Sequence, residues 1–545
     1  MADNDTARVL LKRLDKLKTL RSTWETHWQE IAEYIVPRKA DITVRRSSGD
    51  KRTENIFDGT AIHAAEMLSA SLHGMLTNPS TQWFGLDYLD IALNVDDEAK
   101  EYLESVTEVM QREFQRSNFA EQIHELYHDL ITFGTGVMFI DRAPENQRGI
   151  RFATRHISEC YLSEDEFGRV DTVFREYKLP LRAMARKFGK DAIGEKMRRK
   201  LEKDPYEEVK LLHIVMPRDE RDVNKVDANN KPWASIHIEP EQRLIIREGG
   251  YDEFPYCCPR FLKASFEQGY GRSPSYTALP DTKMINKMSE VTIKAAQKQI
   301  DPPLMVPDDG FILPVRTRPG GLNFYRSGTR DRIEPLNIGA NNPLGLQIEE
   351  QRRSAIRSAF YVDQLVLPQG PQMTATETLA RQETAMRLLG PVLGRLQAEL
   401  LQPCIERVFR VLSRQNIFAD PPENVAETGL QIEYVSPLAK AQRQSDVQSI
   451  VRLFELLSPL AGIDPTVFDH LDLDGHAHRQ RAHANRGARV LAGLAEELDQ
   501  QVGGAVGHLG LVAEVGGAVD HAEQLDDALH LVERAEFGFE RTEQL

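Results

Sequence analysis

The chain has 545 residues, of which 41% are hydrophobic and 28% charged; this balance is typical of a folded protein with several domains and excludes wholesale disorder. Its net charge of −15 argues against a protein that grips nucleic acid tightly, because basic residues supply most of that affinity. No run approaches the roughly 20 apolar residues that span a bilayer, the N-terminus lacks a signal peptide's apolar core, and the four cysteines lack metal-type spacing. We therefore expect a cytosolic protein with reduced thiols and no membrane contact.

The first third of the chain is predicted to be mostly helical. Apolar residues recur at helical spacing over residues 10–35, and Pro37 ends that pattern. Helices are also expected over residues 60–76, 96–117 and 120–133.

From Gly136 the apolar period shortens to that of strands, which predicts an α+β region. Strands are expected over residues 137–141, 150–153, 170–177, 209–216 and 234–238. A helix is expected between them, over residues 181–188.

Between residues 270 and 414 the order of elements is the most informative feature. A helix over 275–300, roughly 40 Å long at 1.5 Å per residue, is followed by a Pro- and Gly-rich insert and a second helix over 344–362. After a short loop, a long helix over 374–412 is predicted to kink at Gly390-Pro391. Another helix is expected over 436–460.

Seven local motifs accompany this order of helix, insert, helix, loop and kinked helix. They are Phe57-Asp58-Gly59-Thr60-Ala61, Thr81-Gln82-Trp83-Phe84, Phe133-Gly134-Thr135-Gly136, Tyr270-Gly271-Arg272-Ser273-Pro274, Met373-Thr374-Ala375-Thr376-Glu377, Arg381-Gln382-Glu383 and the Ala/Ser-rich helix behind the first. Over residues 12–474 the chain resembles the portal proteins, or head-to-tail connectors, of short-tailed bacteriophages.

The resemblance implies a predominantly helical α+β fold that forms a ring. It divides the chain into an N-terminal wing-like region (1–270), a first stem helix (271–300), a clip-like insert (301–340), a second stem helix (341–362), a channel loop (363–373), a kinked long helix with wing (374–435), a crown-like helical region (436–475) and a tail (476–545). The tail has no lysine and departs from the family, and we interpret it as a possible frameshift.

The family further implies a structural protein rather than an enzyme, without cofactors. Copies are expected to form a dodecameric ring at one capsid vertex of the virion after assembly in the host cytoplasm. Expected partners are a terminase motor, capsid, scaffold and tail adaptor proteins, and the double-stranded DNA that is packaged and ejected through the channel.

Four lysines share one face of the first stem helix, within roughly 60° at 100° per residue. They are Lys283, Lys287, Lys294 and Lys298. Met284, Met288, Val291 and Ala295 form an adjacent apolar strip that would pack against neighbouring subunits. The lysines predict either rings of positive charge near DNA or a solvated face paired with Glu349 and Glu350.

Two further segments are candidates for contact with DNA or with other subunits. The channel loop comprises Gln364, Leu365, Val366, Leu367, Pro368, Gln369, Gly370, Pro371 and Gln372. Its glycine and prolines suit a shaped loop, although an ordinary connection has the same composition. The clip-like insert carries Arg316, Arg318, Arg326, Arg330 and Arg332, which suit carboxylate pairing between subunits or contact with a motor, and less so phosphate contact.

One catalytic motif supports an alternative function. His124-Glu125-Leu126-Tyr127-His128 places two histidines on one helical face, where they could hold Zn²⁺ with Glu125 as general base of a hydrolase. No third ligand follows at the spacing of the extended motif, and no phosphate-cradling glycine loop is present. Surface histidines on an ordinary helix are the simpler interpretation, so we expect no metal.

Overall fold

The computed structural model describes residues 2–422 and 432–435, apart from 45, 48, 89–96, 144–148, 223, 226, 302, 306–333, 336–342 and 366–388. The chain divides into two units, Met1–Pro437 and Leu438–Leu545, and all described residues belong to the first. The helix expected over 436–460, the crown-like region and the tail therefore lie outside the described residues.

Four long helices form the N-terminal part, and each prediction of a helix there is confirmed. They are α1 (Ala2–Ile35), α2 (Thr60–Leu76), α3 (Asp97–Arg116) and α4 (Phe119–Phe133). A 3-10 turn, η1 (Pro37–Lys39), follows α1. Gly134 ends α4 in the left-handed conformation that favours glycine. None of the described helices is long and apolar enough to cross a membrane.

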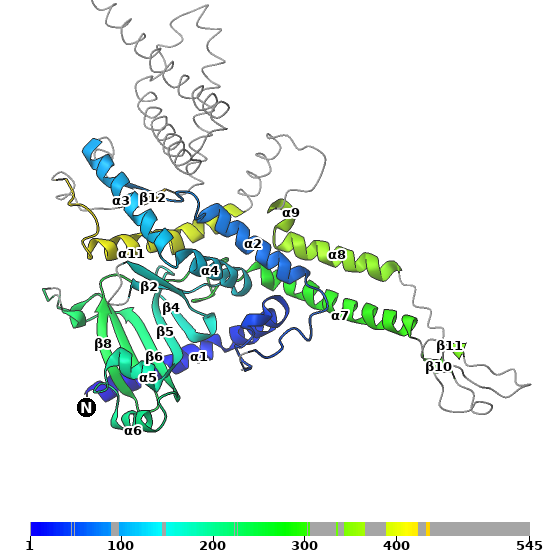
Figure 1. The fold of residues 1–545 in the computed structure, drawn as a ribbon, viewed down its shortest axis with the longest axis horizontal. Coiled ribbons are helices and arrows are strands. Elements are labelled where there is room, and N and C mark those ends of the chain that lie inside the picture. Colours follow the sequence, from blue (N-terminus) through cyan, green and yellow to red (C-terminus); the bar gives the residue numbers. More distant parts are fainter. Residues whose placement is uncertain are drawn as a thin grey trace, which may run out of the picture. The chain divides into compact units, whose positions relative to one another are not determined.

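Two antiparallel sheets make up the α+β region (Figure 1). The larger has the order β4 (Cys160–Glu164), β5 (Val170–Pro180), β6 (Glu208–Pro217), β7 (Trp233–Glu239), β8 (Leu244–Tyr251). The smaller has the order β3 (Ile150–Thr154), β2 (Met138–Arg142), β9 (Tyr256–Cys257). The region also contains two short 3-10 turns, η2 (Ile157–Glu159) and η3 (Ala228–Asn230). A separate antiparallel pair is formed by β1 (Gly85–Tyr88) and β12 (Ile432–Val435).

Both faces of the five-stranded sheet are covered by the same chain. Leu10 and Leu14 of α1 pack on one face, against Phe174, Leu212 and Ile236. The other face is covered at one end by α5 (Leu181–Phe188) and α6 (Glu195–Lys203), and elsewhere packs toward the smaller sheet. All four cysteines are buried free thiols in this region and its surroundings.

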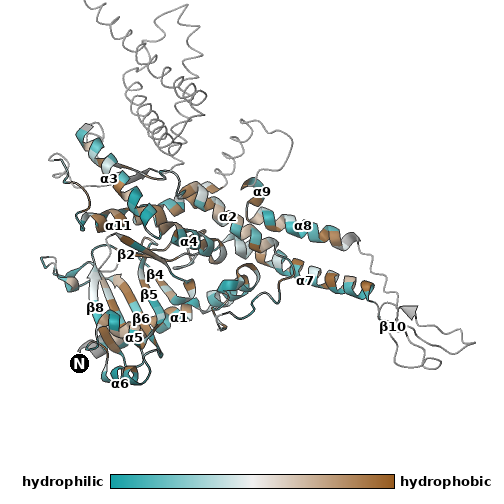
Figure 2. Cartoon of the chain, viewed as in Figure 1, coloured by the Kyte–Doolittle hydropathy of each residue, from teal (hydrophilic) through white to brown (hydrophobic). Residues whose placement is uncertain are grey.

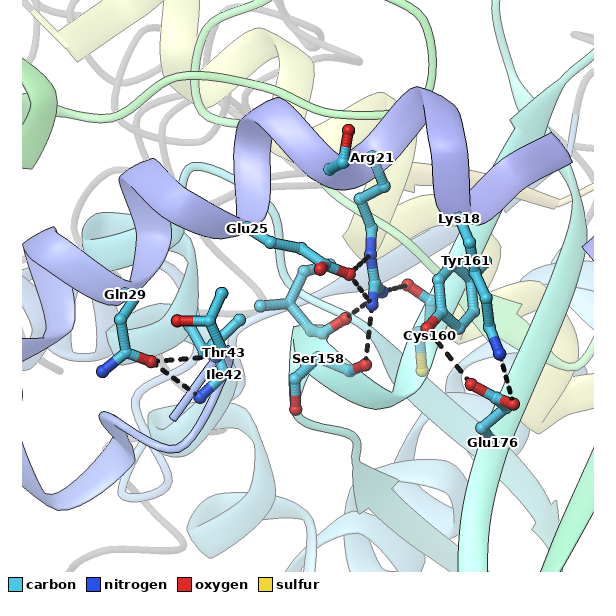
Figure 3. Close-up of polar contacts among 12 residues, drawn as sticks. Lys18, Arg21, Glu25, Gln29, Ile42, Thr43, Ser158, Cys160, Tyr161 and Glu176 are labelled. Carbon is cyan, nitrogen blue, oxygen red and sulfur yellow. Dashed lines mark hydrogen bonds and ion pairs between the residues drawn. The ribbon is translucent and has the colours of Figure 1, made fainter. Parts of the chain in front are cut away.

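A buried arginine fixes α1 to η2 and to the start of β4, at the edge of the five-stranded sheet (Figure 3). The Arg21 guanidinium donates to the carbonyls of Ile157 (2.9 Å), Ser158 (2.9 Å) and Cys160 (2.6 Å), and it pairs with Glu25 at 2.5 Å. A buried charge is tolerated only when its donors are satisfied, so these contacts set the position of α1 along the sheet.

Toward its C-terminal end, the described chain is again helical. Residues 389–396 form a helix that runs through Gly390 and Pro391. A π-helical turn, η4 (Gln397–Leu401), and α11 (Gln402–Ser413) follow. Pro403 has no N–H to continue the α-helical ladder, which accounts for a wider turn at this place. The kink expected at Gly390-Pro391 falls at the edge of the described residues and stays a prediction.

Candidate functional site

Two antiparallel helices form the hairpin expected to be the stem: α7 (Pro274–Ile300) and α8 (Pro343–Ala359) lie side by side (Figure 1). Thr292 on α7 donates to Glu349 on α8 at 2.7 Å, and Arg352 on α8 pairs with Asp281 on α7 at 2.9 Å. Beyond them, β10 (Leu304–Met305) and β11 (Glu334–Pro335) pair antiparallel, so the chain leaves and re-enters the hairpin through two adjacent strands.

The first of the sequence motifs anchors both stem helices. The Asn286 side chain on α7 accepts from the backbone N–H groups of Phe57 (2.7 Å) and Asp58 (3.0 Å), and Arg353 on α8 donates to Asp58 at 2.9 Å. Burial raises the pKa of Asp58, but hydrogen bonds from Thr60 and Arg353 outweigh it and leave that pKa below its ordinary value. The carboxylate therefore remains ionised and ties α2 to the stem.

Two more motifs, distant in sequence, meet where α7 begins. Thr135 accepts from the backbone of Gly271 at 2.8 Å, and Ser273 donates to the carbonyl of Thr132 at 2.9 Å. A Cβ atom on Gly134 would collide with the backbone of Gly271, and Gly134 also has φ of +80°. Both glycines therefore permit a close approach of α4's end to the start of α7.

The lysine stripe is exposed but largely paired with carboxylates. Lys287 and Lys294 contact Glu290 on the same helix at 2.9 and 2.6 Å, and Lys283 pairs with Glu30 of α1. Hydrogen bonds from Lys294 and Lys287 lower the pKa of Glu290 to about 2. Among the described residues, Lys298 meets no carboxylate.

The expected pairing of the lysines with Glu349 and Glu350 is wrong. Glu349 accepts from Thr292 and pairs with Arg353, while Glu350 pairs with Arg353 and Arg357. The reason is geometric: Glu349 lies on the face of α8 that packs on α7, whereas the lysines point away from α8.

From Met284 to its C-terminal end at Ile300, α7 carries exposed apolar side chains on two opposite edges. Met284 and Val291 are 45% and 55% exposed, and Ile293 and Ile300 are 44% and 84% exposed. At 100° per residue the first pair lies about 180° around the helix from the second, with α8 packed between them on one side and the lysines on the other. Hydrophilic and hydrophobic residues accordingly alternate along this half of the helix (Figure 2).

Most of the channel loop and all clip arginines lie outside the described residues. Of the loop, only Gln364 and Leu365 are described, and they belong to a helical turn, α9 (Val362–Leu365). Here the sequence prediction is corrected: the second stem helix ends at Ala359 rather than Val362, because Tyr361 adopts φ of 58° and breaks the helix. Arg316, Arg318, Arg326, Arg330 and Arg332 are not described.

The His-Glu-x-x-His motif lies on α4, and its glutamate forms ion pairs with two basic side chains. Glu125 pairs with Arg38 (3.0 Å) and Lys39 (2.5 Å); burial opposes ionisation, but these hydrogen bonds dominate and lower its pKa to about 2. A general base needs a free carboxylate with a higher pKa. In the described part of the chain no three His, Cys, Asp or Glu side chains are grouped to hold a metal.

The two histidines of that motif differ from each other. His124 is exposed, whereas His128 is buried, so the interpretation of both as surface residues is wrong for His128. Burial, reinforced by Lys39 and Arg38, lowers the pKa of His128 to about 3.

The model of one family, the bacteriophage head to tail connecting proteins, matches residues 7–489. The chain belongs to this family. The assignment confirms the resemblance seen in the sequence, and the function is that of a portal, the connector between head and tail. The protein is therefore a structural component of a phage virion.

Two curated relatives agree with this assignment. The chain is 33% identical over 486 residues to the "Probable portal protein" of Bordetella phage BPP-1, and 31% identical over 485 residues to the "Portal protein" of Salmonella phage epsilon15. Each match covers 87% of this chain and 86% of the relative.

Solved structures give a weaker likeness. A chain of the "Virion of native gene transfer agent (GTA) particle" matches with a TM-score of 0.34 and 12% identity over 80% of this chain and 95% of its own length. A chain of the "Neck of empty GTA particle computed with C6 symmetry" matches with a TM-score of 0.36 and 12% identity over 76% and 94%.

Sequence reasoning missed the residues that join the motifs. Asn286 and Arg353 lie in the stem helices, and their partner Asp58 is more than 200 residues away in the chain. Only the Asp58-x-Thr60 spacing, which is typical of a helix start, gave a local signal, and Thr60 does donate its backbone N–H to Asp58 at 2.9 Å.

Proposed function

We propose that copies of this portal protein assemble into a closed ring at one capsid vertex, with twelve subunits expected, and that the stem hairpins surround the channel through which double-stranded DNA is packaged and ejected. The observation that carries the proposal is the pair of exposed apolar edges on α7. A ring needs two different, complementary patches on each subunit, whereas a two-fold dimer needs one self-complementary patch.

The position of these edges fits such a ring. The edge formed by Met284 and Val291 and the edge formed by Ile293 and Ile300 lie on opposite sides of α7. Each α7 can therefore contact one neighbour on each side, while α8 and the lysine stripe occupy the remaining two directions. Burying these four side chains between subunits removes apolar surface from water, which favours association.

The lysine stripe is proposed to face solvent or the lumen without gripping DNA. Two carboxylates, Glu290 and Glu30, contact three of its four lysines, and the whole chain carries a net charge of −15. Weak attachment suits a channel, because tight phosphate contacts would retard the DNA that passes. The motor that drives packaging, the capsid and scaffold proteins and the tail adaptors are proposed partners from the family.

Assembly is tested with a matched pair of substitutions. Val291→Asp places a charge on the exposed edge of α7, and Val9→Asp makes the same change at a valine of α1 that is 67% exposed. Mass photometry of full-length protein should show rings for the wild type and Val9→Asp, and monomers or small oligomers for Val291→Asp. Intact rings in Val291→Asp would contradict the proposal.

A further inference from the structure

A row of polar residues crosses the five-stranded sheet on the face opposite α1. Arg175 on β5 is directly opposite His213 on β6, His213 is opposite His237 on β7, and His237 is opposite Arg247 on β8. The two imidazole rings stack with centroids 4.2 Å apart and planes at 19°. Burial lowers the pKa of His213 and His237 well below the ordinary value, so both rings are neutral and the two arginines at the ends carry the charge of the row.

Two more cations approach the same row from other elements. Lys187, at the end of α5, brings its Nζ to 3.5 Å from Nε2 of His237 and lies 5.7 Å from the ring centre of Tyr177. The Arg175 guanidinium lies 4.4 Å from the same ring. Arg155 lies directly after β3. Burial, and next to it the positive charges of Arg175 and Arg155, lower the pKa of Lys187 to about 8.

The positive charge of this cluster is not balanced within the described residues. Glu159 pairs with Arg175 at 2.9 Å, and Asp141 is the other carboxylate near the row. Arg155 and Arg247 have no carboxylate partner in the described part of the chain. Three buried polar atoms also have no hydrogen-bond partner: Nε of Arg155, the hydroxyl of Tyr177 and Nδ1 of His237. Buried donors without acceptors cost stability, so an absent acceptor is implied.

We propose that this cluster is a binding site for a phosphoryl oxyanion, held by Lys187, Arg155 and Arg247 and oriented by the hydroxyl of Tyr177. Arginine and lysine donors in several directions match the several acceptor oxygens of a phosphate. Lys187 and Arg247 are exposed whereas His213 and His237 are buried, so the solvent-facing side of the cluster is the side of Lys187 and Arg247.

The surroundings of the entrance favour a polyanion as carrier of that phosphate. The α5–α6 segment, residues 181–203, contains nine basic and three acidic residues, a net charge of +6 in a chain whose net charge is −15. Such a local basic surface is typical of contact with a nucleic-acid backbone. A free phosphate or nucleotide has the same chemistry, and the two sources are separated by experiment. The site itself does not depend on ring assembly or on passage of DNA.

The test compares the double variant Lys187→Gln/Arg247→Gln with the control Lys196→Gln/Lys203→Gln, which removes two charges from α6. All four side chains are exposed, so the fold should survive in both. Thermal unfolding of full-length protein is followed in sodium phosphate and in sodium chloride of equal ionic strength. Wild type and control should gain a saturable rise in Tm with phosphate. The double variant should need at least about tenfold more phosphate, because it lacks two of the charged donors that hold the anion.

Binding of a 24-base-pair duplex, measured by fluorescence anisotropy, identifies the source. If phosphate stabilises the wild type and the double variant binds the duplex at least about tenfold more weakly than the control does, a DNA backbone phosphate is the ligand. If phosphate acts as expected but all three proteins bind the duplex equally, the ligand is a free phosphate or nucleotide. An equal phosphate response in wild type and double variant, or none in either, overturns the site.

Discussion

The five-stranded sheet and the exposed half of α7 use apolar residues in opposite ways. In the sheet, Phe174, Leu212 and Ile236 are covered by α1 of the same chain. On α7, Val291, Ile293 and Ile300 remain exposed although the helix packs on α8. The sheet region is therefore stabilised within one subunit, whereas the stem leaves apolar surface exposed, which we propose is used for contact between subunits. A single chain can thus cover its apolar side chains in one region and leave them exposed to solvent in another.

The largest effect is expected from breaking the internal region at Arg260. This side chain is 2% exposed, pairs with Glu399 of the π-helical turn at 2.6 Å and with Glu164 of β4, and donates to the carbonyl of Gly168 at 2.9 Å. Arg260→Ala leaves the poorly exposed carboxylate of Glu399 without this partner and leaves Glu164 with Lys263 alone. We expect a loss of about 3–5 kcal/mol in the free energy of unfolding, measured by urea denaturation.

The control for this loss is Arg199→Ala, which removes an exposed ion pair with Glu195 on α6. Exposed pairs contribute about 0–1 kcal/mol, so the midpoint should scarcely move. Equal losses in both variants would show that the Arg260 network does not hold the π-helical turn to the sheets.

Two isoleucines of α7 separate internal packing from contacts between subunits. Ile285 is fully buried and Ile293 is exposed, although they lie only about two turns apart. Ile285→Ala should cost about 2–4 kcal/mol in unfolding free energy. Ile293→Ala should change the stability of the isolated subunit by less than about 0.5 kcal/mol but raise the protein concentration needed for rings. Reversed effects would contradict the division of α7 into two halves.

A smaller effect is expected from Glu125 as the pH falls. Its folded pKa of about 2 lies below the ordinary value of 4.5, so its contribution is fully present above pH 4.5 and is lost as the pH falls toward 2. Partial exposure limits it to about 1–2 kcal/mol. Stability followed from pH 7 to 2 should fall less steeply in Glu125→Gln than in wild type, whereas Glu121→Gln, at an exposed site of the same helix, should follow the wild type.

The smallest effect on assembly is expected from shortening the channel loop. Removal of residues 367–370 touches neither α7 nor α8, so rings should form as in the wild type. The loop is proposed to contact DNA sterically, so the deletion should alter the length of DNA that filled heads retain. Equal packaged length and equal leakage in wild type and deletion would make the loop an ordinary connection.

Helices and strands were predicted well where the residues that bound an element and the spacing of its apolar residues indicated the same structure. The helix over 60–76 and the helix over 181–188 match α2 and α5 residue for residue, since Gly59 and Pro180 precede them. The prediction missed α6, which is almost entirely charged and buries only Met197, and β8, whose Gly249 and Gly250 break the alternation. In such elements tertiary packing, rather than local preference, selects the structure.

The stem was predictable in outline but not in its contacts. The period and the bounding prolines indicated α7, and the lysine face follows from residue spacing alone. The partner of Lys283, Glu30, lies 253 residues away, and the opposite apolar edge at Ile293 and Ile300 becomes apparent only when the direction of α8 is known. Long-range pairs of this kind carry no local signal in a single sequence.

The central claim, a ring closed through the two edges of α7, is tested most directly by cysteine cross-linking. Val291→Cys and Ile293→Cys are combined in one chain, whose four native cysteines are buried. After mild oxidation, denaturing electrophoresis should show a ladder of covalent multimers that ends at the ring, whereas either single variant should remain monomeric. A band that stops at the dimer in the double variant, or a dimer from Val291→Cys alone, would indicate a two-fold contact and contradict the ring.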